Sequence, residues 1–206
     1  MEYLYEYDRA NPKSIEEYAR KLIGHTFNDV KEWNLHSEVR EDMLYDDKSR
    51  KGGLGNFIEE KFFGYKANSD SQADFPEAGV ELKVTPYEVK KSGKLSAGER
   101  LVLTMISYEN EVEPDFFQSH VWEKCKLMLL IYYLRDKTLP SNMDYRIDFA
   151  QLFQLPEKDM DIILNDYKVI TEKIKAGKAH ELSESDTMYL GACTKGSTAA
   201  KSLVPQ

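Results

Sequence analysis

Residues 74–86 constrain this chain most, because they combine a strand pattern with charged residues at a defined spacing. They read DFPEAGVELKVTP, in which Asp74, Glu81 and Lys83 follow the pattern D-x6-E-x-K. Apolar and charged residues alternate over residues 80–84, which predicts a strand with its valine and leucine side chains in a core. Glu81 and Lys83 then stand side by side on the opposite face. A turn through the Pro-Glu-Ala-Gly sequence would fold Asp74 back toward them.

This set of side chains has a chemical interpretation and a structural alternative. Two converging carboxylates form a hard oxygen site that suits Mg2+. A lysine on the same strand face positions a water or balances charge on a phosphate, so the three groups together suit metal-assisted phosphodiester hydrolysis. The alternative is an ordinary half-solvated strand, on which Glu81 and Lys83 are solvent-facing partners.

Several segments resemble one protein family in the family's own order. DFPEAGVELKVTP resembles the active-site segment of the MutH family, a branch of the restriction-endonuclease-like PD-(D/E)xK nucleases. The family contains the mismatch-repair enzyme MutH, which nicks one strand, and type II restriction enzymes that cut at GATC. The other matching segments are EYARKLIGHTFNDV, KGGLGNFIEEKFFG, ERLVL, SHVWEKCK and GKAHELSESDTMYLGACTKG. Two segments are more similar in sequence to the restriction-enzyme branch of the family than to the repair branch. They are SDSQADFPEAGVELKVTP and HELSE...CTKG.

The resemblance implies a fold class and a metal site. The fold is α/β, a restriction-endonuclease-like core in which a mixed β-sheet is flanked by α-helices. The family's Mg2+ would be held by Asp74, Glu81 and the Leu82 carbonyl. Lys83 would orient water and phosphate, assisted by a second lysine that the segment SHVWEK places at Lys124. Lys126 is the close competitor for that role.

The family also places a glutamate on the helix predicted from KGGLGNFIEEKFFG, and this chain offers two. Counting forward from Gly55 selects Glu59, whereas counting back from Gly64 or from Asp74 selects Glu60. The chain therefore carries one extra residue between these landmarks. The start of the helix favours Glu59, because it sets the direction of side chains more rigidly than the following loop does. Both remain candidates.

Two regions are candidates for binding DNA. Residues 180–196 are predicted to form a hairpin, and the family uses this region to enter the DNA groove and read bases. Its candidate DNA contacts are Tyr189, Thr194 and Lys195, since lysine can donate to guanine acceptors. Contact with phosphates alone is the alternative. The polar, basic loop after the active-site strand carries Arg100 and the lysines of residues 90–94, which either meet the phosphate backbone or form a solvated hairpin tip.

The rest of the chain reads as alternating helices and strands. Residues 101–108 predict a buried strand, residues 119–124 a short helix or turn, and residues 127–134 an apolar strand. Residues 144–155 predict a further strand or strand–helix junction. Residues 156–175 predict an amphipathic helix that ends at Gly177.

Composition narrows the class of protein. With 206 residues, of which 41% are apolar, the chain is expected to form a single nuclease domain over residues 1–206. No apolar run is long enough to span a membrane, and no signal peptide opens the chain. Cys125 and Cys193 lie far apart without a C-x-x-C motif, which favours a reducing cytoplasm. The net charge of −8 argues against a protein that coats DNA, but not against an enzyme that grips one site.

These observations lead to an expected function and two alternatives. We expect Mg2+-dependent hydrolysis of double-stranded DNA at a short palindrome, GATC above all. GATC-cutting relatives carry a second, related domain, so this chain is expected to be the N-terminal catalytic part of a longer protein. Cutting both strands would then involve that second domain or a homodimer. The alternatives are a strand-nicking repair endonuclease and a non-catalytic DNA-binding effector domain, and the intact Asp74, Glu81 and Lys83 argue against the latter.

Overall fold

The computed structural model describes residues 6–36, 53–65, 72–105 and 112–192. The chain divides into two compact units. The first contains Met1–Val102 and Lys126–Gln154, and the second contains Leu103–Cys125 and Leu155–Gln206. The expectation of one nuclease domain over the whole chain stays a prediction.

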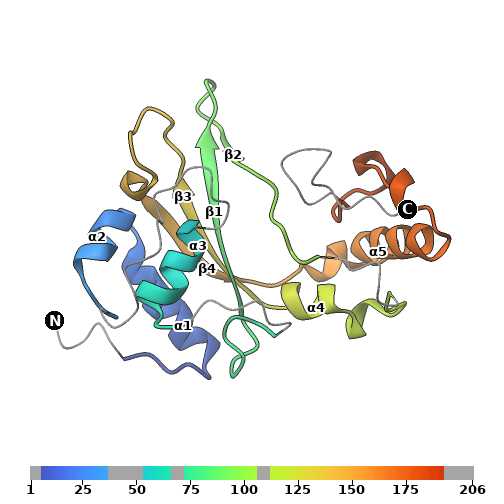
Figure 1. Ribbon diagram of the computed structural model, residues 1–206, viewed down its shortest axis with the longest axis horizontal. Helices are drawn as coiled ribbons and strands as arrows, with labels where there is room; N and C mark the ends of the chain where they lie inside the picture. Colours follow the sequence, from blue (N-terminus) through green and yellow to red (C-terminus); the bar gives the residue numbers. More distant parts are fainter. Residues whose placement is uncertain (1–5, 37–52, 66–71, 106–111, 193–206) are drawn as a thin grey trace. The chain divides into compact units, whose positions relative to one another are not determined.

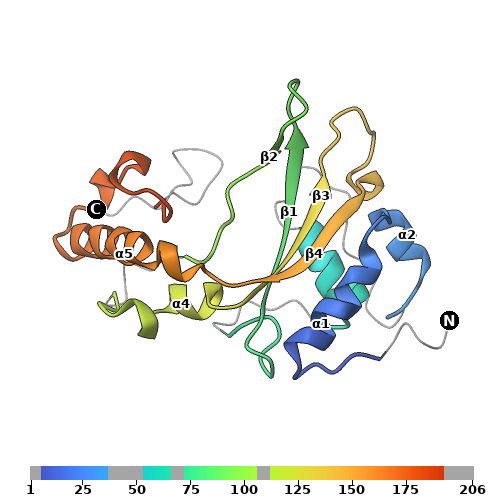
Figure 2. The same cartoon turned by 180° about the vertical axis from the view of Figure 1, so that it is seen from behind.

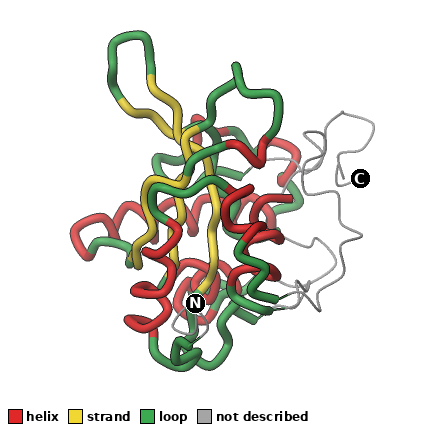
Figure 3. The backbone as a smooth tube through the Cα atoms, turned by 90° about the vertical axis from the view of Figure 1, so that its left-hand side faces the viewer, coloured by secondary structure: helices red, strands yellow, loops and turns green. Residues whose placement is uncertain are grey.

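The first unit is built on a mixed sheet of four strands, which Figures 1 and 2 show from opposite sides. The strand order is β2-β1-β3-β4, in which β1 and β3 are parallel and the two outer pairs are antiparallel. Figure 3 draws these strands in yellow. The bounds are β1 Glu81–Val89, β2 Leu95–Ala97, β3 Met128–Leu134 and β4 Ile147–Phe153. The predicted α/β class is confirmed, as are the strands expected near residues 80–84, 127–134 and 144–155.

Helices pack on the sheet of this unit around an aromatic core. Their bounds are α1 Pro12–Ala19, η2 Arg20–Leu22, α2 Phe27–Glu32, α3 Gly53–Phe57 and η3 Ile58–Phe62, and a short turn η5 spans Asn142–Asp144. α1 packs against β4 and α3 against β1. Phe27, Phe57, Phe62, Phe63 and Phe75 are at most 1% exposed. Burying one such side chain stabilises the fold by roughly 1.5–3 kcal/mol, so this aromatic cluster is a main source of stability.

Alternation along β1 sends its two sets of side chains to opposite faces. Val80 and Leu82 belong to the hydrophobic core, and Val84 packs against it. Leu82 pairs in register with Leu129 of β3, which lies in the same core. The predicted core-facing set is therefore confirmed, and Glu81 and Lys83 stand on the other face.

The prediction of a buried strand at residues 101–108 is wrong for the part that the structure describes. Residues 101–105 form no strand, and Val102 and Met105 are more than half exposed. The apolar run has the composition of a strand, but strand formation depends on a partner edge. Residues 101–105 pair with neither edge strand of the sheet, β2 or β4. Residues 106–108 lie outside the described residues.

The second unit is helical. It contains η4 Phe116–Gln118, α4 His120–Cys125, η6 Glu157–Asp159, α5 Met160–Lys175, η7 Ala179–Glu181 and η8 Glu184–Asp186. Phe116 lies at its centre, with ring centroids 5.2 Å from Tyr167 of α5 and 5.5 Å from Trp122 of α4. The short helix and the long helix predicted here are confirmed. No helix in the described ranges is long and apolar enough to cross a membrane.

The hairpin predicted for residues 180–196 is wrong in its described part. Residues 180–192 contain the turns η7 and η8 and no strand. Ser183 and Asp186 close η8 as a capping box, in which the Ser183 amide donates to Asp186 Oδ2 at 2.7 Å. Serine and aspartate side chains that bond nearby amides compete with strand pairing, and here the local turn wins.

Candidate active site

A tight turn delivers Asp74 to the start of β1. The Phe75 amide donates to the Val80 carbonyl at 2.9 Å, and the Ala78 amide donates to the Phe75 carbonyl at 3.2 Å. Gly79 closes the turn with φ of +64°, a left-handed conformation that glycine adopts without strain. The chain thus reverses between Phe75 and Val80, and Asp74 folds back on β1 as predicted.

Asp74 is held by the backbone of the strand that carries the other two candidates. Its Oδ2 accepts a hydrogen bond from the Leu82 amide at 2.8 Å. The preceding amide, that of Glu81, donates to the Leu127 carbonyl beside β3 at 3.0 Å. These two bonds anchor the first residues of β1. The Asp74 carboxylate therefore lies at the peptide that joins Glu81 to Leu82.

Glu81 is buried and carries an ion pair. It is 3% exposed, and Lys83 Nζ donates to its Oε1 at 2.9 Å. The Lys83 side chain is 16% exposed. A half-solvated strand face would leave both side chains in water, so this alternative does not describe Glu81. Burying a charged pair costs desolvation that the attraction often fails to offset, and such pairs are weak sources of stability. The Glu81–Lys83 pair is therefore poorly explained by stability alone.

The oxygen donors at this position fit Mg2+. They are the carboxylates of Asp74 and Glu81 and the carbonyl of the intervening strand residue Leu82. Mg2+ takes one or two carboxylates and fills its remaining positions with water. The described residues contain no group of three or more His, Cys, Asp or Glu side chains that could hold a metal.

The helix that carries the candidate glutamates changes its winding in the middle. α3 is α-helical through Phe57, and η3 continues it as a π-helical turn over Ile58–Phe62. The Phe63 amide bonds the Ile58 carbonyl five residues back, at 3.0 Å. A π-turn accommodates one extra residue in a helix and is frequent at functional sites. It is a physical reason why counting from the two ends selects different glutamates.

The two glutamates differ in burial. Glu60 is 6% exposed, whereas Glu59 is only half-buried. Phe62 and Phe63, which follow them, are fully buried. Counting from the helix start favours Glu59, but burial favours Glu60. A glutamate is rarely buried unless its charge has a partner, so solvation does not explain the position of Glu60.

The two candidate lysines lie on different structural units. Lys124 belongs to α4 in the second unit and is 8% exposed. Lys126 belongs to the first unit, and its Cε would lie 3.9 Å from a Cβ atom at Gly79, beside the turn that carries Asp74. Between them, burial raises the pKa of the Cys125 thiol to about 12. Cys125 is therefore a packing residue and not a nucleophile.

The DNA-binding candidates fall in three places. Arg100 is exposed and follows β2 in the first unit. Tyr189 is 54% exposed in the second unit, with its amide bonded to Asp166 Oδ2 at 2.6 Å. Thr194 and Lys195 lie outside the described residues. The sequence interpretation missed Asp166, although an aspartate within the apolar stripe of α5 was the available signal.

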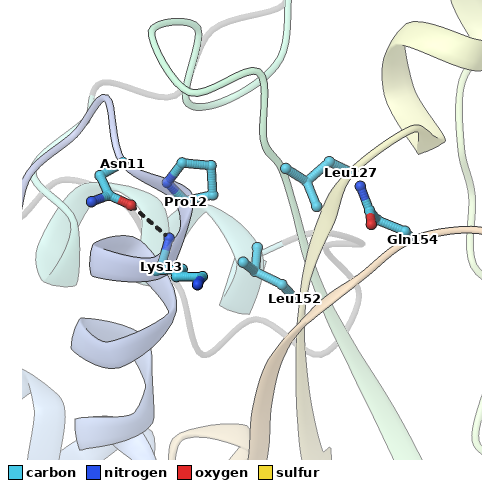
Figure 4. Close-up of a pocket in the computed structure, with 6 residues that line it drawn as sticks. All are labelled: Asn11, Pro12, Lys13, Leu127, Leu152 and Gln154. Atoms are coloured by element: carbon cyan, nitrogen blue, oxygen red, sulfur yellow. Dashed lines mark hydrogen bonds between the residues drawn. The ribbon is translucent and has the colours of Figure 1, made fainter.

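An open pocket is lined by residues that precede and begin α1 and by residues in or beside β3 and β4 (Figure 4). Its lining residues are Asn11, Pro12, Lys13, Leu127, Leu152 and Gln154. Asn11 caps α1 by accepting from the Lys13 amide at 3.0 Å. Because the lining contains no carboxylate, this pocket is not the metal site.

Comparisons with known proteins bear on the family. The family model described as DNA mismatch repair enzyme MutH matches residues 63–166, about half of the chain. The type II restriction enzyme Sau3AI of Staphylococcus aureus is 42% identical over 155 residues, which are 74% of this chain and 31% of that enzyme. The DNA mismatch repair protein MutH of Shewanella amazonensis is 29% identical over 153 residues, which are 74% of this chain and 66% of that protein. The chain thus spans about a third of the first relative and just under two thirds of the second.

The matched family region includes Asp74, Glu81 and Lys83, the residues that the structure gathers at the start of β1. The chain belongs to the MutH family.

Proposed function

We propose that this chain is the nuclease domain of a Mg2+-dependent type II restriction endonuclease. Its substrate would be double-stranded DNA at a short palindrome, with GATC the expected site. The observation that carries the proposal is the arrangement of Asp74, Glu81 and Lys83 around the Leu82 peptide. Restriction is favoured over strand-nicking repair because the chain is 42% identical to Sau3AI and 29% identical to a MutH protein.

Asp74, Glu81 and the Leu82 carbonyl would hold Mg2+. Bound Mg2+ would supply positive charge to the phosphate oxygens and favour ionisation of the attacking water. The water oxygen would bond to phosphorus as the bond from phosphorus to one sugar oxygen breaks, and that oxygen would leave and take up a proton to become a hydroxyl group. Lys83, which Glu81 holds at 2.9 Å, would orient that water and offset the charge that develops on the phosphate.

Three further residues complete the proposal. Glu60 is the preferred glutamate for contact through the water shell, because it is buried while Glu59 is only half-buried. Lys124 is the expected second lysine by its place in the SHVWEK segment. Lys126 is its competitor, supported by its position beside Gly79.

The partners follow from the reaction. Cutting both strands of a palindrome needs two active sites acting together or one site acting twice. A second domain or a homodimer would supply the second site. We place the protein in the cytoplasm, which is consistent with the free thiol of Cys125.

Incubation with plasmid DNA and Mg2+ tests the proposal. The wild-type chain should give discrete fragments that map to one short site. Asp74→Ala should slow cleavage by about a hundredfold or more, since it removes a charged group that acts in the transition state. Glu77→Gln is the matched control, because Glu77 is an exposed carboxylate on the same turn and should tolerate the change.

Other outcomes would redirect the assignment. Nicked circles that persist without linear product would indicate a strand-nicking repair enzyme. Binding without cleavage at any Mg2+ concentration would indicate a non-catalytic effector domain. Cleavage by Asp74→Ala at the wild-type rate would refute the role given to this carboxylate.

A further inference from the structure

The helix α5 contains a buried carboxylate that the proposed reaction does not use. Ile163, Tyr167 and Ile170 form the buried stripe of this helix, and Asp166 lies on the same stripe with 2% exposure. Aspartate is almost never fully buried unless its charge is compensated. The compensation comes from outside the helix.

Three consecutive backbone amides converge on Asp166. The Met188 amide lies 3.0 Å from Oδ1 and 3.1 Å from Oδ2. The amides of Tyr189 and Leu190 donate to Oδ2 at 2.6 Å and 3.0 Å. Successive amides that face one anion form a concave binding arrangement, and hydrogen bonds to an ionised acceptor are stronger than neutral ones. One side chain thus fixes three residues that belong to no helix or strand.

A second tie holds the same segment further upstream. Lys173 of α5 donates to Asp186 Oδ2 at 2.8 Å and to the Glu181 carbonyl at 3.2 Å. The Lys173 and Asp186 side chains are each more than a fifth exposed, so their ion pair contributes little to the stability of the fold. It does fix the path of the chain leading to Met188. The segment is therefore ordered along α5 at two separate points.

The ordered segment presents two large side chains to solvent. Met188 is 72% exposed and Tyr189 is 54% exposed, although their amides are bonded to a buried group. The Tyr189 hydroxyl lies 3.4 Å from Asp159 Oδ1. In duplex DNA, methionine can insert as a wedge between base steps, and a tyrosine hydroxyl can donate to a phosphate oxygen. Exposed apolar side chains on a backbone held this firmly suggest a prepared contact surface.

We propose that Asp166 is a positioning residue that holds Met188 and Tyr189 ready to contact duplex DNA. The inference rests on the proposed function, since it takes DNA as the partner. Without Asp166 the three residues would be ordered only on binding, and that loss of entropy would oppose association. Asp166 therefore acts on DNA affinity and not on the chemical step.

The experiment compares Asp166→Asn with Asp161→Asn in the full chain. Asp161 is an exposed aspartate on the same helix and serves as the matched control. Amide hydrogen exchange at residues 188–190 should become at least about tenfold faster in Asp166→Asn, while exchange within α5 stays unchanged. Affinity for a short fluorescent GATC duplex, measured with Ca2+ so that the DNA is not cut, should fall about tenfold to a hundredfold. The cleavage rate at saturating DNA and Mg2+ should not fall.

Surface variants keep the inference testable even if Asp166→Asn folds poorly. Met188→Ala and Tyr189→Ala alter only exposed side chains, and each should weaken binding of the same duplex. Adding Tyr189→Ala to Asp166→Asn should reduce DNA affinity little further, because Asp166→Asn already disrupts the contact that Tyr189→Ala removes. Additive losses would show that Asp166 acts elsewhere and would overturn the inference.

The outcomes separate this inference from the proposed function. If the wild-type chain cuts DNA but neither surface variant weakens binding, the inference fails and the function stands. If the wild-type chain neither binds nor cuts DNA, the proposed function fails and the DNA-contact role fails with it.

Discussion

Replacing Phe75 with leucine tests whether core packing sets the position of Asp74. Phe75 directly follows Asp74 and is 1% exposed. Its ring makes edge-to-face contacts with Phe63 at 4.9 Å and with Tyr65 at 5.2 Å. Each such pair contributes about 0.5–1.5 kcal/mol beyond burial, so loss of both should cost about 1–3 kcal/mol.

Activity should fall further than stability explains. The Phe75 amide and carbonyl close the turn with Val80, so movement of this residue moves Asp74. Misplacing a catalytic group by about 1 Å can cost a hundredfold in rate. We expect Phe75→Leu to reduce the single-turnover cleavage rate by about tenfold or more under conditions in which the variant is fully folded.

Phe117→Leu is the matched control. Phe117 also makes edge-to-face contacts with two rings, Phe116 at 5.5 Å and Trp122 at 5.1 Å, but it is 50% exposed and lies in the second unit. It should lose less than about 1 kcal/mol and keep its cleavage rate. Urea unfolding followed by circular dichroism measures the free energies. A Phe75→Leu variant that is destabilised yet cuts at the wild-type rate would refute the link between this ring and Asp74.

Two other predictions concern reactivity and charge. In a Cys193→Ser variant the remaining thiol, Cys125, should react with a thiol reagent at pH 8 only after the chain unfolds. Burial raises the pKa of this thiol to about 12, so roughly one molecule in ten thousand carries the thiolate at pH 8. Fast reaction of the folded chain would contradict this. Replacing the three lysines of residues 90–94 with glutamine should weaken DNA binding equally for all sequences and reduce the slope of log affinity against log salt by up to about 3. An unchanged slope would show that this turn does not meet phosphates.

The strand β1 was predictable because its signal is local. Alternation over residues 80–84 indicates a strand in any context, and the glycine and proline before it indicate a turn. Both features formed as predicted. What alternation does not reveal is whether the charged face meets water, because that depends on segments that pack there later. The burial of Glu81 is therefore a finding of the structure.

Other features depend on competition between elements. The π-turn at Ile58–Phe62 inserts one residue within a helix, and no single-residue preference marks such an insertion. Residues 101–105 have strand composition but pair with neither edge strand, β2 or β4, and composition alone does not show whether a partner edge is reached. The sequence pattern places Asp166 in a helix, and an aspartate on an apolar stripe predicts a buried partner. That partner lies more than twenty residues away, which no local pattern shows.

The spacing D-x6-E-x-K has a structural origin in the turn before β1. Phe75 and Val80 form an antiparallel bridge, and continuing that bridge by one residue on each side places Asp74 opposite Glu81. The six residues between the carboxylates are thus the number that this turn and bridge require. A turn longer by one residue would shift Asp74 opposite Leu82, whose side chain belongs to the core. The two carboxylates would then no longer meet at one peptide. The spacing of the motif therefore reflects the strand register, and this register places the Asp74 carboxylate beside that of Glu81.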